Sequence, residues 1–368
     1  MIKNVVILGA TGSIGQSARK VAADIPDRMR IVGMSAHSNA GELAQAAAAF
    51  PDAQTALSSG PNGAAELIRL ATLPEADLVL IAIVGTGGLQ PALAAIEAGK
   101  DIAVASKEIL VMAGEIVMAA AERRGVRVLP VDSEHNAIYQ CLEGRSSESV
   151  SRLILTCSGG PFRQASAETI QTATPAQALK HPTWSMGQKI SIDSATLFNK
   201  GLEMIEARWL FGVPMEKVDV IIHPQSIIHS MVEFVDGSVL AQLSHSDMCF
   251  PIQYAVTWPE RVPNSLTPLN FAELGRLDFE APRREVFPAL DLARHAGERG
   301  GTLPAVLNAA NEAAVAAFLE ARIPFPKIWQ LVEEAMSVCD FLSSPTLAEL
   351  IGADAQARLV LQSLVDRT

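Results

Sequence analysis

The sequence predicts an α/β protein with a doubly wound N-terminal domain, an α+β central domain and a C-terminal helical bundle. Over residues 1–131, short apolar runs alternate with helical patterns, which is typical of a parallel sheet covered by helices. Beyond that region the alternation stops, and two strand-like segments meet at Asp236-Gly237, as in an antiparallel hairpin. In residues 289–368, apolar residues recur at helical spacing in about four segments, which favours a bundle.

The composition is that of a globular protein. The 368 residues predict two to three domains, 49% of them are hydrophobic, and the formal net charge is −11. A nucleic-acid partner is not expected, because phosphate backbones require a basic surface, and no apolar run approaches the ~18 residues that suggest a membrane span. The N-terminus shows no secretory leader, and no CxxC pair occurs, so we expect a cytoplasmic protein. The cysteines are Cys141, Cys157, Cys249 and Cys339.

A glycine-rich turn follows the first predicted strand, residues 5–8. It runs from Gly9 to Gly15, and a helix is expected over residues 17–25. Such glycines let backbone N–H groups and a helix N-terminus approach a pyrophosphate, as in Rossmann-like domains. Because the spacing is GxxGxxG and not GxGxxG, a plain strand-to-helix turn stays open as the alternative.

The second predicted strand, residues 30–35, bears on the choice of nicotinamide cofactor. It ends in Ala36, His37, Ser38 and Asn39, with no acidic residue where an NAD site would bind the ribose 2′-hydroxyl. That absence favours NADP, whose 2′-phosphate His37, Ser38 and Asn39 are placed to contact. The alternative for His37 is a solvated loop residue.

The alternation then continues to residue 131. The expected strands are 55–57, 76–84, 101–105 and 126–131, and the expected helices are 41–50, 64–71, 89–98 and 109–124. We expect three strand exits, at Gly85, Lys107 and Asp132, to share one crevice, because ligands bind at the carboxyl ends of parallel strands. Lys107 is therefore a site candidate, although a lysine after a strand is often only solvated.

Two carboxylates, Asp132 and Glu134, stand directly after the last strand of this region. Hard oxygen donors at such an edge suit Mg²⁺ or Mn²⁺ better than zinc. The alternative is that one of them caps the helix expected to start at His135.

The central region carries a further anion-binding signal and an irregular segment. A strand over residues 153–157 ends in Ser158-Gly159-Gly160-Pro161, and such glycine turns favour anions. The first half of residues 181–194 has neither helical nor strand period, which suggests a movable lid. Trp184 and Met186 in this segment fit ordinary core filling equally well.

A helix expected over residues 195–211 places Asn199, Glu203 and Glu206 on one face. A carboxylate there is usually solvated, but one near the core edge would complete a metal site begun by Asp132 and Glu134. A strand at 218–222 and the hairpin follow, and an antiparallel sheet in this position is a common dimerisation surface. We therefore expect domains at 1–131, 132–258 and 289–368, with a proline-rich linker at 259–288.

Several motifs together resemble one enzyme family, the 1-deoxy-D-xylulose 5-phosphate reductoisomerases. They are Gly9-Ala10-Thr11-Gly12-Ser13-Ile14-Gly15, Val131-Asp132-Ser133-Glu134-His135-Asn136, Ser158-Gly159-Gly160-Pro161-Phe162, His181-Pro182-Thr183-Trp184-Ser185-Met186-Gly187, Asn199-Lys200-Gly201-Leu202-Glu203 and His223-Pro224-Gln225-Ser226. The resemblance implies NADPH- and metal-dependent conversion of 1-deoxy-D-xylulose 5-phosphate to 2-C-methyl-D-erythritol 4-phosphate, in non-mevalonate isoprenoid biosynthesis. It also implies a cytoplasmic homodimer.

Carried over position by position, the resemblance implies a complete site. The implied metal ligands are Asp132, Glu134 and Glu203, which with Lys107 form the catalytic group. The implied substrate-binding residues are Ser133, Glu134, Ser158, His181, Trp184, Ser194, Asn199, Lys200 and Glu203, with phosphate on Ser158, Ser194, Asn199 and Lys200. The implied cofactor residues are Thr11, Gly12, Ser13, Ile14, His37, Ser38, Asn39, Ser106, Glu108 and Gly187.

The chain departs from the family pattern in three places. Ser106-Lys107-Glu108-Ile109 stands for Asn-Lys-Glu-Ser, Asp247-Met248-Cys249-Phe250-Pro251 for Asp-Met-Arg-Thr-Pro, and His37 for a basic residue. Two other classes of protein stay open from the residues alone. One is an aldehyde dehydrogenase with Cys157 as nucleophile, and the other is a non-catalytic nucleotide sensor.

Overall fold

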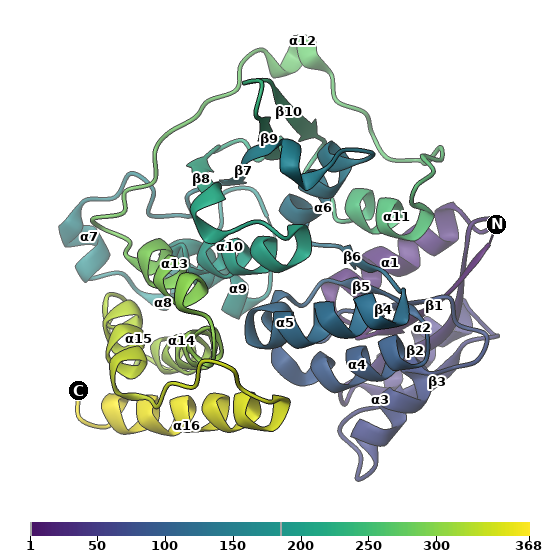
Figure 1. Ribbon diagram of the computed structural model, residues 1–368, viewed down its shortest axis with the longest axis horizontal. Helices are drawn as coiled ribbons and strands as arrows, with labels where there is room; N and C mark the ends of the chain where they lie inside the picture. Colours follow the sequence, from purple (N-terminus) through teal and green to yellow (C-terminus); the bar gives the residue numbers. More distant parts are fainter. Residues whose placement is uncertain (1, 185) are drawn as a thin grey trace. The chain divides into compact units, whose positions relative to one another are not determined.

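The computed structural model describes residues 2–184 and 186–368, and the chain forms two compact units. The first unit comprises Met1–Leu110, Gly114–Gln140 and Asp247–Leu269. The second comprises Val111–Ala113, Cys141–Ser246 and Asn270–Thr368. Figure 1 shows the elements of both units in sequence colours.

A six-stranded sheet forms the centre of the first unit, with the strand order β3-β2-β1-β4-β5-β6 and parallel pairing throughout. This order is the doubly wound one, and the predicted fold class is confirmed. Residues 5–8 and 78–81 in the central strands are fully buried, which explains their continuous apolar runs. The strands are β1 (Lys3–Leu8), β2 (Met29–Ala36), β3 (Gln54–Leu57), β4 (Leu78–Ile81), β5 (Asp101–Val104) and β6 (Val128–Pro130).

Five helices of the first unit begin one to four residues earlier than the sequence predicted, and two of these shifts concern the site. The first starts at Ser13 instead of residue 17, because Gly15 already lies in its opening turn against the end of β1. The sixth starts at Ser133, so Ser133 and Glu134 belong to its first turn. The helices are α1 (Ser13–Asp24), α2 (Ala40–Ala48), α3 (Gly63–Ala71), α4 (Leu89–Glu97), α5 (Lys107–Arg124), α6 (Ser133–Leu142) and α11 (Cys249–Thr257).

Helix α11 belongs to the first unit although the sequence analysis placed its residues in the central domain at 132–258. It packs against α1, and its apolar residues join the core around β1. Cys249, Ile252 and Val256 are buried there. The predicted boundary at 258 and the predicted linker at 259–288 therefore do not coincide with the compact units, because α11 packs on α1 and β6, which are distant from it in the chain.

The second unit contains a four-stranded sheet with the order β10-β9-β7-β8. The predicted hairpin is confirmed as β9 and β10, and β7 pairs antiparallel with β9 and parallel with β8. The strand β10 ends the sheet on one side, and three of its five residues are exposed. The strands are β7 (Val150–Cys157), β8 (Val218–Ile222), β9 (Ile228–Phe234) and β10 (Val239–Leu243).

The helix that the sequence predicted over residues 195–211 is in fact two helices. The first, α9 (Gln188–Thr196), ends before Leu197, and the second, α10 (Phe198–Phe211), begins after it. Leu197 has φ of +66°, which interrupts the helical path, and its side chain is buried. Helical periodicity could not show this break, because the apolar spacing continues across it.

Helices fill the C-terminal part of the second unit, as predicted. Helix α14 is buried along most of its length and contacts α13, α15 and α16. These helices are α13 (Ala289–Arg299), α14 (Leu303–Leu319), α15 (Lys327–Val338) and α16 (Leu347–Val365), and the short helices of the unit are α7 (Ala167–Gln171), α8 (Pro175–Ala178) and α12 (Phe271–Leu274).

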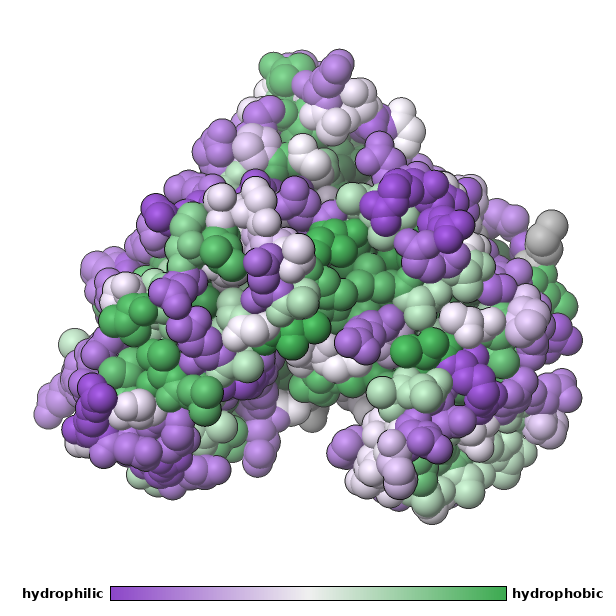
Figure 2. All heavy atoms as spheres, turned by 60° about the horizontal axis from the view of Figure 1, so that its bottom comes forward, coloured by the Kyte–Doolittle hydropathy of each residue, from purple (hydrophilic) through white to green (hydrophobic). Residues whose placement is uncertain are grey.

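Hydrophobic residues reach the surface in several places between hydrophilic ones on the face that Figure 2 draws. Across the described part of the chain, none of the helices combines the length and the apolar character that crossing a membrane requires.

Candidate active site

The glycine turn of the first unit is shaped for close approach by a ligand. Gly9 has φ of +98°, and a Cβ there would lie 2.4 Å from the Ala82 carbonyl oxygen. A Cβ on Gly15 would lie 2.3 Å from the Gly9 oxygen. The turn therefore tolerates no side chain at either position, and it delivers Thr11, Gly12 and Ser13 to the N-terminus of α1. The residues present fit a dinucleotide pyrophosphate.

The end of β2 holds the predicted 2′-phosphate residues, which are all exposed. The His37 ring nitrogen Nδ1 lies 3.0 Å from the Ser58 hydroxyl, which follows the neighbouring strand β3. The Asn39 side chain caps α2, accepting from the Glu42 N–H at 3.1 Å and donating to the Glu42 carboxylate at 2.9 Å. The sequence showed no acidic residue in this loop, but helix capping brings Glu42 to it.

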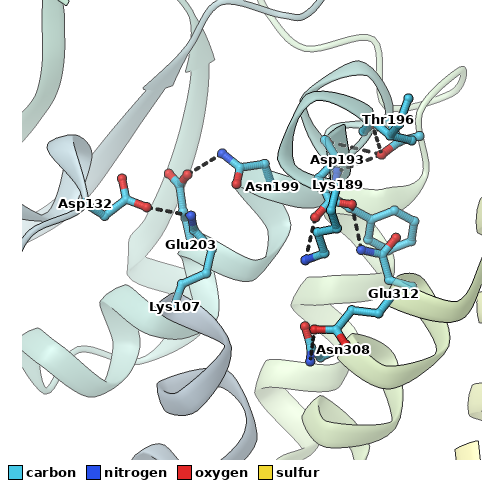
Figure 3. Close-up of polar contacts among 12 residues, drawn as sticks. Lys107, Asp132, Lys189, Asp193, Thr196, Asn199, Glu203, Asn308 and Glu312 are labelled. Carbon is cyan, nitrogen blue, oxygen red and sulfur yellow. Dashed lines mark hydrogen bonds and ion pairs between the residues drawn. The ribbon is translucent and has the colours of Figure 1, made fainter. Parts of the chain in front are cut away.

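The next two strand exits are joined by a buried ion pair. The Lys107 Nζ lies 2.6 Å from the Asp132 carboxylate, and the Lys107 side chain is 6% exposed (Figure 3). Burial alone would raise the pKa of Asp132, but the charges of Lys107 and His135 outweigh it and hold that pKa well below its usual range. Asp132 is therefore an anion, as a metal ligand must be.

The remaining predicted residues at these strand exits are neighbours of Lys107 or Asp132 in the chain. The Ser106 hydroxyl donates to the Ile83 carbonyl and lies 3.4 Å from the Gly85 carbonyl, so all three predicted exits are neighbours. The Ser133 hydroxyl donates to the Glu134 carboxylate at 2.6 Å. Glu108 is buried in the first turn of α5.

In the second unit, Ser158 and His181 form a directed pair. The His181 Nδ1 accepts from the backbone N–H groups of Thr183 at 3.2 Å and Trp184 at 2.9 Å. The Nε2 of a neutral ring then carries the proton, and it donates to the Ser158 hydroxyl at 2.9 Å. The Ser158 oxygen also accepts from the Gly160 N–H at 3.2 Å. Because the Ser158 oxygen accepts two hydrogen bonds, its hydroxyl proton is available to be donated to a further acceptor.

The segment predicted to be a lid rests on β9 and the loop before it. The Thr183 hydroxyl lies 3.2 Å from that of Ser226, and the Trp184 ring centroid is 6.3 Å from that of His229. Ser226 was named only as part of a motif and His229 was not predicted as a site residue, because only the folded sheet brings them to residues 183 and 184. Gly187 caps the start of α9, and Ser185 of the family motif lies outside the described residues.

The predicted phosphate residues Ser158 and Ser194 come together in the second unit. Gly160 has φ of +68°, and a Cβ on it would lie 2.7 Å from the Ser194 carbonyl oxygen. The glycine turn therefore packs directly against α9, whose last turn carries Ser194. After the Leu197 break, α10 presents Asn199 and Lys200 in its first turn.

The Glu203 carboxylate is almost completely buried and is bonded by both of these neighbours. The Lys200 Nζ lies 2.5 Å from one oxygen. The Asn199 Nδ2 lies 2.5 Å from the other, as Figure 3 shows. The side chains of Lys200 and Glu203 are 2% and 1% exposed. Pairing with a cation and an amide donor favours the charged form of a buried carboxylate, and the role of Glu203 as a metal ligand stays a prediction.

The carboxylates of the predicted metal site fit a hard divalent cation by their chemistry. Asp132, Glu134 and Glu203 offer oxygen atoms only, which Mg²⁺ and Mn²⁺ prefer. Asp132 and Glu203 are each neutralised by an ammonium group, from Lys107 and Lys200 respectively. The adjacent ammonium group favours the ionised form of each carboxylate and holds it in place, and a cation site needs ionised carboxylates. Their convergence on one ion stays a prediction.

The predicted thiol nucleophile of the aldehyde dehydrogenase alternative lies inside the sheet. The Cys157 Sγ is at the end of β7, 3.7 Å from the Ile221 carbonyl oxygen of the neighbouring strand β8. This contact turns the sulfur toward a backbone carbonyl.

Comparison with known proteins agrees with the motifs. The family model for 1-deoxy-D-xylulose 5-phosphate reductoisomerase matches residues 5–60 and 51–114. Two family models for the C-terminal domains of this enzyme match residues 128–211 and 243–360. A relative of that name from Symbiobacterium thermophilum is 51% identical over 379 residues, with 97% of each chain covered.

Two solved structures are similar over nearly the whole chain. The 1-deoxy-D-xylulose 5-phosphate reductoisomerase from Zymomonas mobilis in complex with NADPH is 41% identical, with 100% of both chains covered and a TM-score of 0.92. A DOX-P reductoisomerase in complex with NADPH, fosmidomycin and magnesium is 38% identical, covering 99% of this chain and 98% of that one, with a TM-score of 0.90. Since sequence and fold agree over this length, the chain belongs to the 1-deoxy-D-xylulose 5-phosphate reductoisomerase family.

Proposed function

We propose that this chain is an NADPH-dependent oxidoreductase that converts 1-deoxy-D-xylulose 5-phosphate to 2-C-methyl-D-erythritol 4-phosphate in non-mevalonate isoprenoid biosynthesis, with Mg²⁺ or Mn²⁺. The observation that carries the proposal is the buried Lys107–Asp132 ion pair. It lies at the strand exits of the sheet that also bears the glycine turn for the cofactor. Membership of the family supplies the substrate.

The carboxylates of Asp132, Glu134 and Glu203 are the residues we assign to the metal ion. When bound, the ion supplies Lewis-acid stabilisation of negative charge on the substrate oxygens, and NADPH supplies a hydride. Lys107 holds the Asp132 carboxylate in place at 2.6 Å and adds positive charge beside it. The Ser133 hydroxyl donates to the Glu134 carboxylate at 2.6 Å and so also holds that carboxylate in place.

The substrate's phosphate is assigned to Ser158, Ser194, Asn199 and Lys200. Three neutral donors and one cation suit a dianion in a confined pocket. The contact between Gly160 and the Ser194 backbone supports this grouping for the two serines. His181 serves it indirectly, because it directs the Ser158 hydroxyl proton outward.

Residues 181–187 are assigned the task of excluding water. A reaction that rearranges a carbon skeleton passes through reactive species that must not escape. The bonds from Thr183 and Trp184 to the His181 ring hold residues 181–184 together. We assign Trp184 to the substrate side and Gly187 to the cofactor.

We further propose a cytoplasmic homodimer that pairs through β10. This strand ends its sheet, and Val239 and Leu240 on it are 47% and 38% exposed. An exposed apolar edge strand pairs readily with a second edge. Leu240→Lys should shift the protein to monomers in sedimentation experiments, and an unchanged dimer would assign the contact to another surface.

Oxidation of NADPH is the direct test of the activity. The protein is mixed with NADPH and 1-deoxy-D-xylulose 5-phosphate, with Mg²⁺, with Mn²⁺, or with a chelator. We expect metal-dependent loss of NADPH absorbance and formation of 2-C-methyl-D-erythritol 4-phosphate, identified by mass spectrometry. Absence of turnover with either metal would refute the proposal.

A further inference from the structure

Helix α9 governs where one of the proposed phosphate ligands lies. Ser194 is in its last turn, and the helix ends two residues later, before Leu197. The backbone of Ser194 packs directly on Gly160. A small rotation or shift of α9 would therefore move the Ser194 hydroxyl relative to Ser158.

The residue before Ser194 turns a carboxylate into the interior of the second unit. The Asp193 side chain is only 1% exposed. The Lys189 Nζ lies 2.7 Å from one of its oxygens, one helical turn earlier (Figure 3). The Asn311 amide donates to the other oxygen at 2.8 Å. A buried carboxylate is costly unless it is paired and hydrogen-bonded, so these two contacts hold α9 firmly.

Asn311 reaches Asp193 from helix α14, which lies 118 residues later in the chain. Its own NH₂ group must face the carboxylate, because the amide oxygen would be repelled there. The amide oxygen then points elsewhere, and it is buried without a hydrogen-bond partner among the described residues. An unsatisfied buried carbonyl costs stability. Packing alone would favour an apolar residue, as at Ala310 and Ala314 beside it.

We propose that Asn311 and Asp193 are a positioning pair for the substrate's phosphate. Through this pair, helix α14 holds α9, and with it the Ser194 hydroxyl and the corner at Leu197, in the arrangement that receives the phosphate. Neither residue contacts substrate. The pair gives the C-terminal helices a part in substrate binding. The inference rests on the proposed function, since the phosphate-bearing substrate is taken from it.

The first test is Asn311→Leu, which keeps the volume and removes the donor. We expect the KM for 1-deoxy-D-xylulose 5-phosphate to rise by about tenfold, the size of effect that loss of one hydrogen bond to a charged group has. The kcat should change by no more than about twofold, because a binding contact is lost and not a contact specific to the transition state. NADPH affinity, measured by fluorescence titration, should stay the same.

A rescue experiment separates the specific pair from general packing. Asn311→Asp places two carboxylates against each other and should raise KM further than Asn311→Leu. Adding Asp193→Asn restores one amide and one carboxylate with their roles exchanged, so KM should return toward the wild-type value. A double variant no better than Asn311→Asp would contradict the proposal.

The matched control is Asn308→Leu. Asn308 is one turn earlier on α14, equally buried, and donates to Glu312 at 3.2 Å instead of Asp193. Both leucine variants should lower the melting temperature, but only Asn311→Leu should raise KM. If both variants lose the same amount of melting temperature and neither changes KM, Asn311 is a purely structural residue.

Hydrogen exchange gives an outcome that does not depend on turnover. Amides of residues 188–197 should exchange faster in Asn311→Leu than in Asn308→Leu, and unchanged exchange there would overturn the pair by itself. If the wild type fails to oxidise NADPH with the substrate, the proposed function is at fault. If Ser194→Ala leaves KM unchanged, the phosphate assignment is at fault, and the positioning of that phosphate falls with it.

Discussion

The His181 imidazole donates from Nε2 to the Ser158 hydroxyl at 2.9 Å, while its Nδ1 accepts from two backbone N–H groups of the segment that follows. One ring thus connects a proposed phosphate ligand to residues 183 and 184. The tautomer follows from the two donors at Nδ1 and needs no further assumption. A change in this ring should therefore alter substrate binding and the order of the segment together.

Replacing His181 with Gln should separate those two effects. The glutamine NH₂ group can still donate to Ser158, but it offers the Thr183 and Trp184 amides no acceptor in the place of Nδ1. We expect KM to rise by roughly five- to thirtyfold, since one to two neutral hydrogen bonds are lost, each contributing about 1 kcal/mol. His181→Ala should raise KM more, and equal values for the two variants would show that the Ser158 contact contributes little.

The metal assignment predicts loss of turnover with cofactor binding intact. Asp132→Asn and Glu203→Gln keep the shape of each side chain and remove its charge, so affinity for Mg²⁺ should fall and kcat should drop by about a hundredfold or more. Calorimetric titration with Mg²⁺ and fluorescence titration with NADPH measure the two properties. Asp219→Asn, an exposed carboxylate paired with Arg152, is the control and should behave as wild type. Full metal-dependent activity in Glu203→Gln would remove Glu203 from the site.

Lys200→Met tests the buried pair with Glu203. It removes the phosphate's proposed cation, so KM should rise by a factor that corresponds to about 1.5–3 kcal/mol. It also leaves the Glu203 carboxylate buried without its ammonium, which lowers the free energy of unfolding in the absence of metal. Mg²⁺ should then stabilise the variant more than the wild type in thermal unfolding. Equal stabilisation of both proteins by Mg²⁺ would argue that the ion does not reach Glu203.

We predict that the 2′-phosphate of NADPH lies at the end of β2, beside His37, Ser38 and Asn39. The Glu42 carboxylate, bonded to Asn39 at 2.9 Å, opposes a phosphate in this loop. Glu42→Gln should raise the ratio of kcat/KM for NADPH to that for NADH by roughly fivefold, as removal of about 1 kcal/mol of repulsion in a solvated site does. His37→Gln should lower the same ratio if the His37–Ser58 pair binds the phosphate. A ratio that neither substitution moves would place the 2′-phosphate elsewhere.

Cys249 should be less reactive than the two half-buried thiols of the folded protein, Cys157 and Cys339. Burial raises the pKa of its thiol to about 12, and the neighbouring Asp247 adds to the effect. At pH 8 only about one molecule in ten thousand then carries the thiolate at this position, and the thiolate is the form that reacts. Iodoacetamide labelling followed by mass spectrometry should find Cys249 modified after the half-buried Cys157 and Cys339. In urea, which unfolds the protein, the three cysteines should be modified at similar rates.

The sequence by itself determined the parallel sheet of the first unit and predicted the residue types of the site. Apolar runs, glycines after the first strand and carboxylates after the last are local features, and local physics is enough to interpret them. The continuous apolar runs indicated strands that are buried on both faces of a parallel sheet. The Asp236-Gly237 turn likewise identified its hairpin, because the turn and the strands are adjacent in the chain.

Only the tertiary structure decided which distant groups meet. It broke the helix predicted over residues 195–211 at Leu197, where packing imposes a positive φ that no periodicity records. It returned α11 to the core of the first unit, and it brought Ser58 to His37 and Asn311 to Asp193. A hydrogen bond between residues 118 positions apart depends on the packing of two helices. The residues near either partner in the chain hold no trace of it.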